Sequence, residues 1–294
     1  MDETKNGLLT RRQALRSLIT ITAGTLIRPA SIFGAAPVKN NLRFSLLGDW
    51  GTGDSDGAGI ARQIAQAHRN KPLDFIIGVG DNIYPDGGER HFAKKFEEPF
   101  STLLKEQVNF YTVLGNHDVR DGREAQCRYP LFNMNGHSYY TLKKGDGLAE
   151  FFMLDSTDFD AAQTGWLEGA LRASTARWKL PVFHHPIYSS GKSHGSALEL
   201  RKRLEPMFTR YGAHAVFSGH DHIYERTKPQ QGIQYFVTGG GGKVRRGGTD
   251  LNSPFMAKSF DADNHFMQIE IDDQQISFQA ISESGMVVDC GVIN

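Results

Sequence analysis

Short groups of Asp, Asn, His and Tyr recur along the sequence, each directly after an apolar run. The clearest is Gly-Asp-Asn-Ile-Tyr at residues 80–84, which follows a β-branched run at residues 75–79. Asp81 carries two oxygens and can bridge two metal ions, while the phenolate of Tyr84 is a hard anionic ligand that suits Fe(III). Taken alone, the two residues are more typical of a turn-capping carboxylate and a half-buried tyrosine.

The recurrence of this pattern favours a metal site. Four further strand ends carry a metal-competent group: Asp49 in Gly-Asp-Trp-Gly, Asn116 in Gly-Asn-His-Asp, His184 in His-His-Pro, and the pair His220 and His222 in Gly-His-Asp-His. Functional groups of α/β sheets gather at the carboxyl ends of the strands. The oxygen and nitrogen donors, without a thiolate, suit Fe, Mn or Zn, and they are too many for one ion. The set therefore indicates two ions that share Asp81.

The elements that must position these groups alternate between strands and helices. We expect strands at residues 43–47, 75–79, 109–114, 139–142, 149–154, 179–183, 213–218 and 234–238, and a hairpin formed by 266–271 and 276–280. We expect helices at residues 60–68, 92–103, 163–172 and 196–211. The second helix carries a core stripe of Phe92, Phe96, Phe100 and Leu103, and the last helix kinks or restarts at Pro206. Residues 119–135 look irregular. The absence of repeats and linkers predicts one domain.

The composition excludes several classes of protein. The chain has 294 residues with 33 basic and 33 acidic side chains. Because basic residues are not in excess, nucleic acid is not expected as a partner. Cys127 and Cys290 are too few for a disulfide scaffold, and whether they pair stays open. The Gly-Lys-Ser-His-Gly segment at residues 191–195 matches the spacing of a serine-hydrolase elbow, but no strand leads directly into it.

The first 36 residues have the features of an export signal. A twin-arginine pattern at residues 10–15 precedes an uncharged run at 17–27 and small residues at 34–36. We expect residues 1–36 to be a twin-arginine signal peptide and residues 37–294 to be the mature domain, exported folded by the twin-arginine machinery to the periplasm or beyond. A basic amphipathic N-terminal helix is the alternative. The apolar run is too short to span a bilayer stably, so no stable membrane association is expected.

Taken in order, the motifs resemble those of the calcineurin-like metallophosphoesterases. Tyr84 makes the chain similar to the purple acid phosphatases, of the small tartrate-resistant type, over residues 42–292. The resemblance implies an α/β fold, a four-layer αββα sandwich of two mixed β-sheets with the metals at one edge. Two departures stand out. Pro181 replaces a valine of the family pattern, and the short passage from Asp155 to Trp166 leaves no room for the inhibitory loop of the animal enzymes.

The resemblance also implies roles for individual residues. The Fe(III) site would be held by Asp49, Asp81, Tyr84 and His222, and the site of a divalent Fe, Zn or Mn ion by Asp81, Asn116, His184 and His220. His117 would be the phosphate-contacting acid. His194 resembles a second such histidine, although it lies one residue further along than the family pattern. His185 is expected beside the site, and the remaining histidines (His68, His91, His137, His214 and His265) are expected to be structural.

The implied activity is hydrolysis of small phosphate monoesters by a metal-bound hydroxide, with an acid optimum. A phosphodiesterase or nucleotidase on the same site is the first alternative. A non-catalytic metal- or phosphate-binding protein on the same scaffold is the second.

Overall fold

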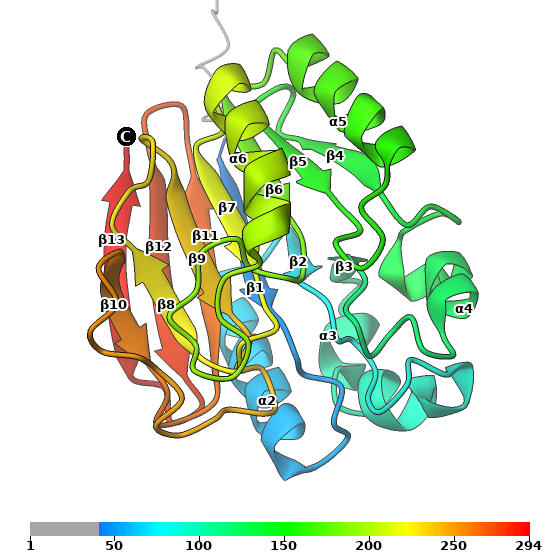
Figure 1. Ribbon diagram of the computed structural model, residues 1–294. Helices are drawn as coiled ribbons and strands as arrows, with labels where there is room; N and C mark the ends of the chain where they lie inside the picture. The colour runs from blue at the N-terminus through cyan, green and yellow to red at the C-terminus, as the bar shows by residue number, and fades with distance from the viewer. Residues whose placement is uncertain (1–40) are drawn as a thin grey trace, which may run out of the picture. The chain divides into compact units, whose positions relative to one another are not determined.

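The computed structural model describes residues 41–294, all of which belong to one structural unit. The segment 1–36, predicted to be a signal peptide, lies outside the described residues. Strands and helices alternate along most of the chain, and the last strands follow one another directly (Figure 1). Within residues 41–294 no helix is both long enough and apolar enough to cross a membrane.

The first sheet has six strands in the order β13-β12-β11-β1-β2-β3. Their bounds are β1 Leu42–Leu47, β2 Phe75–Gly78, β3 Asn109–Thr112, β11 His265–Ile271, β12 Ile276–Ser282 and β13 Val287–Ile293. β1, β2 and β3 run parallel, whereas β11, β12 and β13 pair antiparallel. The carboxyl ends of the three parallel strands therefore lie at the same edge of this sheet.

The second sheet has seven strands in the order β10-β8-β9-β7-β6-β5-β4. Their bounds are β4 Tyr140–Lys144, β5 Ala149–Met153, β6 Trp178–Val182, β7 Ala215–Ser218, β8 Tyr224–Thr227, β9 Gln234–Thr238 and β10 Met256–Phe260. The central strands β5, β6, β7 and β9 are parallel, and the flanking strands are antiparallel. Both sheets are thus mixed, as predicted.

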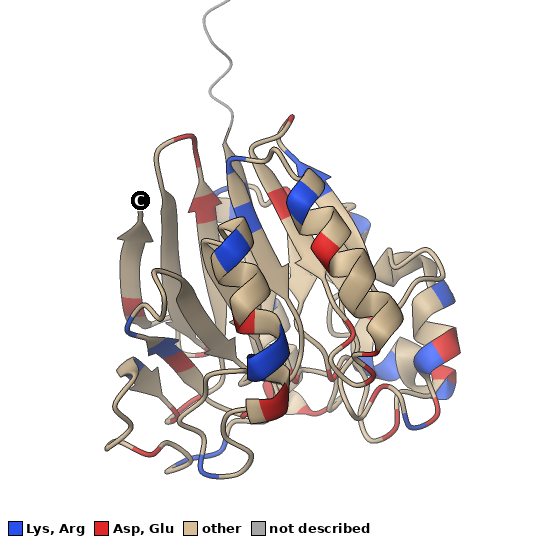
Figure 2. Ribbon diagram, turned by 45° about the horizontal axis from the view of Figure 1, so that its top comes forward, with Lys and Arg blue, Asp and Glu red and all other residues tan. Residues whose placement is uncertain are grey.

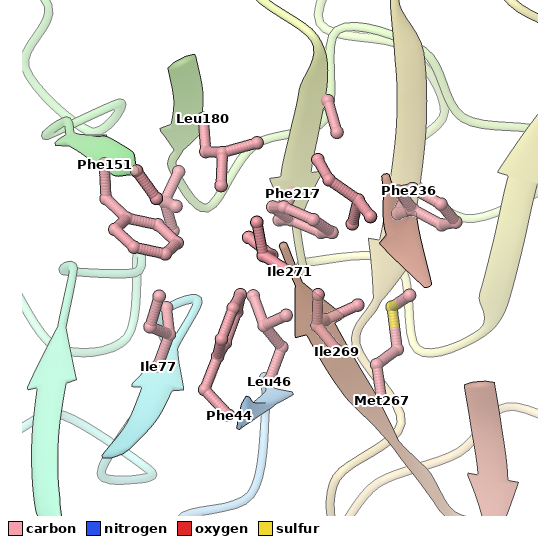
Figure 3. Packing of buried hydrophobic residues seen from close by; sticks show 14 of the residues in the cluster. Phe44, Leu46, Ile77, Phe151, Leu180, Phe217, Phe236, Met267, Ile269 and Ile271 are labelled. Atoms are coloured by element: carbon pink, nitrogen blue, oxygen red, sulfur yellow. The ribbon is translucent and has the colours of Figure 1, made fainter. Parts of the chain in front are cut away.

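The main core lies between the two sheets. Phe44 and Leu46 are two residues apart on β1 and therefore lie on the same face of the strand, which points to the second sheet (Figure 3). The Phe44 ring stacks on Phe75 at 4.9 Å and meets the edge of Phe151 at 5.3 Å between centroids. Burial of side chains of this size stabilises the fold by about 1.5–3 kcal/mol each.

Helices cover the outer face of each sheet. On the first sheet, α2 (Ser55–Asn70) buries Ile60 and Ile64 in a cluster that also holds Ile76 of β2. On the second sheet, α5 (Ala161–Ala173) and α6 (Leu198–Tyr211) contribute Leu167 and Phe208 to another cluster. The coloured Lys, Arg, Asp and Glu positions lie mainly on helices and loops, and the strands are largely tan (Figure 2). The four-layer αββα sandwich predicted from the sequence is therefore confirmed.

The prediction of one continuous helix at residues 92–103 is wrong. The segment instead holds a 3₁₀ turn (Glu89–His91), a π-helical turn (Ala93–Glu97) and the short α3 (Ser101–Lys105). Pro99 explains the break, because it lacks the backbone N–H that a continuous helix would use at this position. The predicted apolar stripe is nevertheless buried in one cluster, with Phe96 and Phe100 5.6 Å apart.

Other local predictions also differ from the structure. The stretch expected to be irregular contains α4 (Arg123–Arg128) and a 3₁₀ turn (Pro130–Phe132). The helix α6 runs through Pro206 as one element, without a restart. The sequence did not indicate β8, β10 or β13. β10 and β13 are partly exposed strands at sheet edges, and β8 has only four residues, two of which are the charged Glu225 and Arg226, so none of the three carries a clear apolar pattern.

Candidate metal centre

The metal-competent side chains lie in the turns that follow β1, β2, β3, β6 and β7. At three of them the backbone is left-handed: φ is 58° at Asp49, 51° at Asp81 and 71° at His220. Residues other than glycine seldom adopt this conformation. When the surrounding structure enforces it, the position is often functional. The three turns therefore aim these side chains in fixed directions instead of leaving them to solvent.

Glycines before the motif residues allow the turns to approach closely. A Cβ atom at Gly115 would lie 2.2 Å from Oδ1 of Asp81, and one at Gly80 would lie 2.6 Å from Nδ1 of His184. Both distances are far shorter than any real contact. Only glycine at these two positions lets the turns after β2, β3 and β6 meet.

Asp81 and His184 form one half of the centre. Nδ1 of His184 donates to the Val79 carbonyl at 2.9 Å, and Nε2 lies 3.5 Å from Oδ1 of Asp81 and 3.2 Å from Oδ1 of Asn116. Burial holds the pKa of His184 well below its usual value, so the ring is neutral. Because a carbonyl only accepts, the ring hydrogen sits on Nδ1, and Nε2 presents a lone pair to oxygen atoms. A cation between them satisfies all three groups.

Asp49, Tyr84 and His222 form the other half. The Tyr84 hydroxyl donates to Oδ1 of Asp49 at 3.0 Å, and Nε2 of His222 lies 3.3 Å from each of these oxygens. Desolvation raises the pKa of the fully buried Asp49 to about 6 and raises the pKa of Tyr84 as well. An ionised Asp49 carboxylate is costly at this depth without a counter-charge, and a cation there would also favour loss of the Tyr84 proton. This donor set therefore also fits a cation.

Asp49, Asp81 and His184 connect the two halves. One donor atom from each of these three buried side chains lies within 4.8 Å of the others. His220 joins them: its backbone N–H donates to Oδ2 of Asp49 at 3.0 Å, and its ring lies 5.0 Å from that of His184. Burial lowers the pKa of His220 to about 2, so this ring too is neutral and able to bind metal.

The two predicted catalytic histidines lie beside these donors. The His117 backbone N–H donates to Oδ1 of Asp81 at 2.9 Å, and its ring is 4.5 Å from that of Tyr84. The ring of His194 is 4.1 Å from that of His220. Every site residue predicted from the sequence thus lies in one contiguous cluster, although the positions span most of the chain.

His185 lies next to the cluster, as expected. Its ring is 4.5 Å from His220, and its Nδ1 lies 2.9 Å from Oγ of Ser156. Burial lowers the pKa of His185. The ring therefore packs against the site as a neutral group that Ser156 holds in place.

The sequence analysis assigned no role to two carboxylates that support the centre. The buried Asp118 accepts backbone hydrogen bonds from Asn82, Ile83 and Gly115 at 2.8–3.0 Å, and so ties the turn after β2 to the turn after β3. Desolvation raises its pKa to about 7. A signal was present in the sequence, because Asp118 is the last residue of the Gly-Asn-His-Asp motif and directly follows Asn116 and His117, which both have assigned roles.

The second supporting carboxylate is Asp221. It accepts from Oγ of Ser189 at 2.6 Å and from the backbone N–H groups of His194 and Gly195 at 3.2 and 3.0 Å. This buried side chain therefore holds the loop that carries His194 over His220. It lies between the two histidines of the Gly-His-Asp-His motif, a position that could have drawn attention to it.

Comparison with known proteins agrees with this geometry. A family described as calcineurin-like phosphoesterase matches residues 42–224. Purple acid phosphatase 17 of Arabidopsis thaliana is 31% identical over 250 residues, which cover 74% of this chain and 73% of that protein. Tartrate-resistant acid phosphatase type 5 of Mus musculus is 29% identical over 250 residues, 72% of this chain and 76% of that protein.

Two solved structures share the fold. Purple acid phosphatase PPD1 from yellow lupin seeds superposes with a TM-score of 0.74 at 19% identity, over 87% of this chain and 54% of that one. GAP50, the anchor in the inner membrane complex of Plasmodium, has the same TM-score at 22% identity, over 87% of this chain and 89% of that one. With these relatives and the cluster at the strand ends, the chain belongs to the calcineurin-like phosphoesterase family, among the purple acid phosphatases, which hydrolyse phosphate monoesters at a dinuclear metal site.

Proposed function

We propose that the centre holds Fe(III) together with a divalent Fe, Zn or Mn ion, and that the enzyme acts on small phosphate monoesters with an acid optimum. The observation that carries this proposal is the buried contact of neutral His184 with the Asp81 and Asn116 oxygens, beside a second buried cluster that contains a tyrosine. A phenolate favours a trivalent ion, and the nitrogen and oxygen donors of the other half suit a divalent one.

The proposed ligands follow the two halves of the centre. Fe(III) is assigned to Asp49, Asp81, Tyr84 and His222, and the divalent ion to Asp81, Asn116, His184 and His220. The contacts among these side chains support the division, because Tyr84 and His222 meet Asp49, whereas Asn116 and His220 meet His184. One oxygen of Asp81 lies beside Nε2 of His184, and a donor atom of Asp49 lies within 4.8 Å of donor atoms of both residues. This position between the two halves suits a ligand that both ions share.

When bound, the two ions lower the pKa of the attacking water and supply positive charge for the phosphoryl oxygens. The protein supplies the acid. Nδ1 of His117 donates to the Pro85 carbonyl at 2.7 Å, which leaves Nε2 to give a proton to the leaving alkoxide. His194, held by Asp221, is placed to donate a hydrogen bond to a phosphoryl oxygen. The expected acid optimum follows from the charge of Fe(III), which would lower the pKa of the attacking water further than a divalent ion does.

The absorption spectrum and metal content of the purified protein test the proposal. Fe(III) bound to Tyr84 gives a charge-transfer band in the visible, and Tyr84→Phe removes the band. A colourless wild-type protein without iron would refute the assignment. Turnover of p-nitrophenyl phosphate against bis(p-nitrophenyl) phosphate separates the monoesterase from the phosphodiesterase alternative.

We also propose export by the twin-arginine machinery to the periplasm or beyond. That machinery carries folded proteins, and a centre built from turns far apart in the chain requires the completed fold before it can hold its ions. Changing Arg11 and Arg12 to Lys in the cell and following the location of phosphatase activity tests this. Unchanged location of the active enzyme would refute it.

A further inference from the structure

The His194 loop (residues 189–195) brings His194 to the metal centre. The His194 ring lies 4.1 Å from that of His220, and within residues 41–294 it has no hydrogen-bond partner of its own. The side chain is exposed, so the packing of neighbouring groups restrains it only weakly. The position of the ring therefore depends on how firmly the backbone of the loop is held.

Asp221 holds the two ends of this loop. It accepts hydrogen bonds from Oγ of Ser189 at one end and from the N–H groups of His194 and Gly195 at the other. A Cβ atom at Gly191 would lie 2.1 Å from the carboxyl carbon of Asp221, so the loop passes closely around this side chain. The contacts of Asp221 thus fix where the loop begins and where it ends.

A second buried carboxylate, Glu225, binds the same loop at Ser190. Oε2 of Glu225 accepts from the Ser190 N–H and Oε1 accepts from the Ser190 hydroxyl, both at 2.6 Å. Glu225 lies on β8, three residues after His222, and has no exposed surface. Hydrogen bonds to an ionised carboxylate are roughly twice as strong as those between neutral groups. The two short contacts therefore fix both the peptide and the side chain of Ser190.

The charge of Glu225 has no counter-ion. Burial raises the pKa of Glu225 to about 6, the Asp221 carboxylate adds to this rise, and the two Ser190 donors oppose it. No cationic side chain among residues 41–294 forms an ion pair with Glu225. A buried charge without a partner of opposite sign is costly. The two hydrogen bonds from Ser190 are what offsets this cost, so the role of the carboxylate is to place Ser190.

Ser190 is also the point at which a second loop joins the first. The Asp250 N–H donates to the Ser190 carbonyl at 2.8 Å, and the Lys192 N–H donates to the Gly248 carbonyl at 2.7 Å. The hydrogen-bonding groups of the Ser190 peptide and side chain are therefore committed to Glu225 on one side and to residue 250 on the other. A shift of Ser190 would move the residues that follow it, including His194.

We propose that Glu225 is a positioning residue for the phosphatase reaction, which holds Ser190 and thereby keeps the His194 ring over His220, within reach of a phosphoryl oxygen. This inference rests on the role of His194 in the proposed function. Glu225 acts through Ser190 and the loop, without being assigned a contact with the reacting groups. Displacement of a catalytic group by about 1 Å can cost 10²-fold in rate.

A double-mutant cycle tests whether Glu225 acts through His194. Glu225→Gln keeps the shape of the side chain, removes its charge and turns an amide NH₂ group toward a donor of Ser190. In the otherwise wild-type enzyme, kcat/KM for p-nitrophenyl phosphate is expected to fall about tenfold. In the His194→Ala enzyme the same change is expected to cost less than about twofold, because the group that it positions is already absent.

A matched control separates this effect from general destabilisation. Glu150 is another buried carboxylate of the second sheet, on β5, and lies 3.8 Å from Nζ of Lys143. Glu150→Gln should change kcat/KM by the same factor with and without His194, because the two sites are independent.

Two further measurements do not depend on turnover. The metal content of Glu225→Gln should equal that of the wild type. The affinity of the metal-loaded enzyme for inorganic phosphate, measured by calorimetry, should fall about threefold, the scale of one weakened hydrogen bond.

Three results would overturn the inference. An unchanged kcat/KM would show that Glu225 does not position the loop, equal losses with and without His194 would show that it supports the fold in general, and loss of metal would show that it acts on the centre through β8. If Glu225→Gln melts far below the wild type, Ser190→Ala takes its place in the cycle with an expected loss of about threefold, because it removes only the hydroxyl contact. Failure of the proposed function looks different, because His194→Ala alone would then leave kcat/KM unchanged.

Discussion

Nε2 of His184 lies 3.5 Å from Oδ1 of Asp81, and both side chains are buried. The opposite nitrogen of His184 is committed to the Val79 carbonyl, so a lone pair and a carboxylate oxygen face each other with no hydrogen between them. Such a pair is destabilising unless a cation lies there. The folded state is therefore more stable with a cation between His184 and Asp81 than without one.

Removing the metals should lower stability as well as activity. A ligand that binds only the folded state raises the free energy of unfolding by mass action. We expect a chelated sample to melt at a lower temperature than the loaded enzyme and to regain both melting temperature and phosphatase activity on adding iron and zinc. Equal melting temperatures with and without metal would contradict this prediction.

Asp81→Ala should abolish binding of both ions and all turnover. Asp81 is the carboxylate that both halves of the centre contact, and its oxygen also accepts the His117 N–H. Elemental analysis of the purified variant and a p-nitrophenyl phosphate assay measure the two losses. The exposed Asp158→Ala is the control and should retain metal and activity. A variant at residue 81 with full turnover would rule out the bridging role.

His117→Ala should keep the metals and lose kcat by ~10²-fold, the usual scale of acid catalysis. The loss should be larger for an alkyl phosphate than for an aryl phosphate, because a poor leaving group depends more on protonation. Metal content, measured on the same sample, separates this effect from loss of the centre. Unchanged rates on both esters would show that His117 is not the acid.

Asp221→Ala should loosen the loop that carries His194. The change leaves the backbone N–H groups of the exposed His194 and the half-buried Gly195 without their acceptor, which costs about 0.5–1.5 kcal/mol for each lost hydrogen bond. We expect lower stability in urea and a lower kcat. Ser189→Ala removes only one of the hydrogen bonds to Asp221 and should have a smaller effect on both. Matching effects of the two variants would argue against this role of Asp221.

His265 should make stability depend on pH. Its ring is fully buried, and burial lowers its pKa to about 4, against a smaller opposing effect of the Asp263 backbone. The unfolded chain binds a proton near pH 6.5, so stability is full above that value and falls by about 3 kcal/mol as the pH drops from 6.5 to 4.

The variant His265→Phe keeps a ring of similar shape and cannot titrate. Its free energy of unfolding, measured in urea between pH 4 and pH 7, should vary less with pH than that of the wild type. Parallel curves for the two proteins would mean that His265 contributes nothing to acid sensitivity.

Local sequence was sufficient for the strands and their ends. The run at residues 75–79 is apolar and β-branched, and the glycine and aspartate after it mark the turn that holds Asp81, so strand and ligand candidate are both visible within ten residues. The same holds for β1, β3, β6 and β7. The order of these motifs then indicated the family and the layered fold, because five independent signals in sequence agree on one arrangement.

Contacts between distant segments decided the rest. Pro99 divides the expected helix at residues 92–103, and burial of the Phe96 and Phe100 rings against neighbouring elements decides the shape of the pieces. Asp118 and Asp221 have no periodic signal, since their partners are backbone N–H groups of other turns. Tyr84 and His222 are 138 residues apart and meet at 3.3 Å. Sequence specifies which side chains are able to bind a metal, whereas their convergence depends on two sheets packing face to face, which is a property of the whole core.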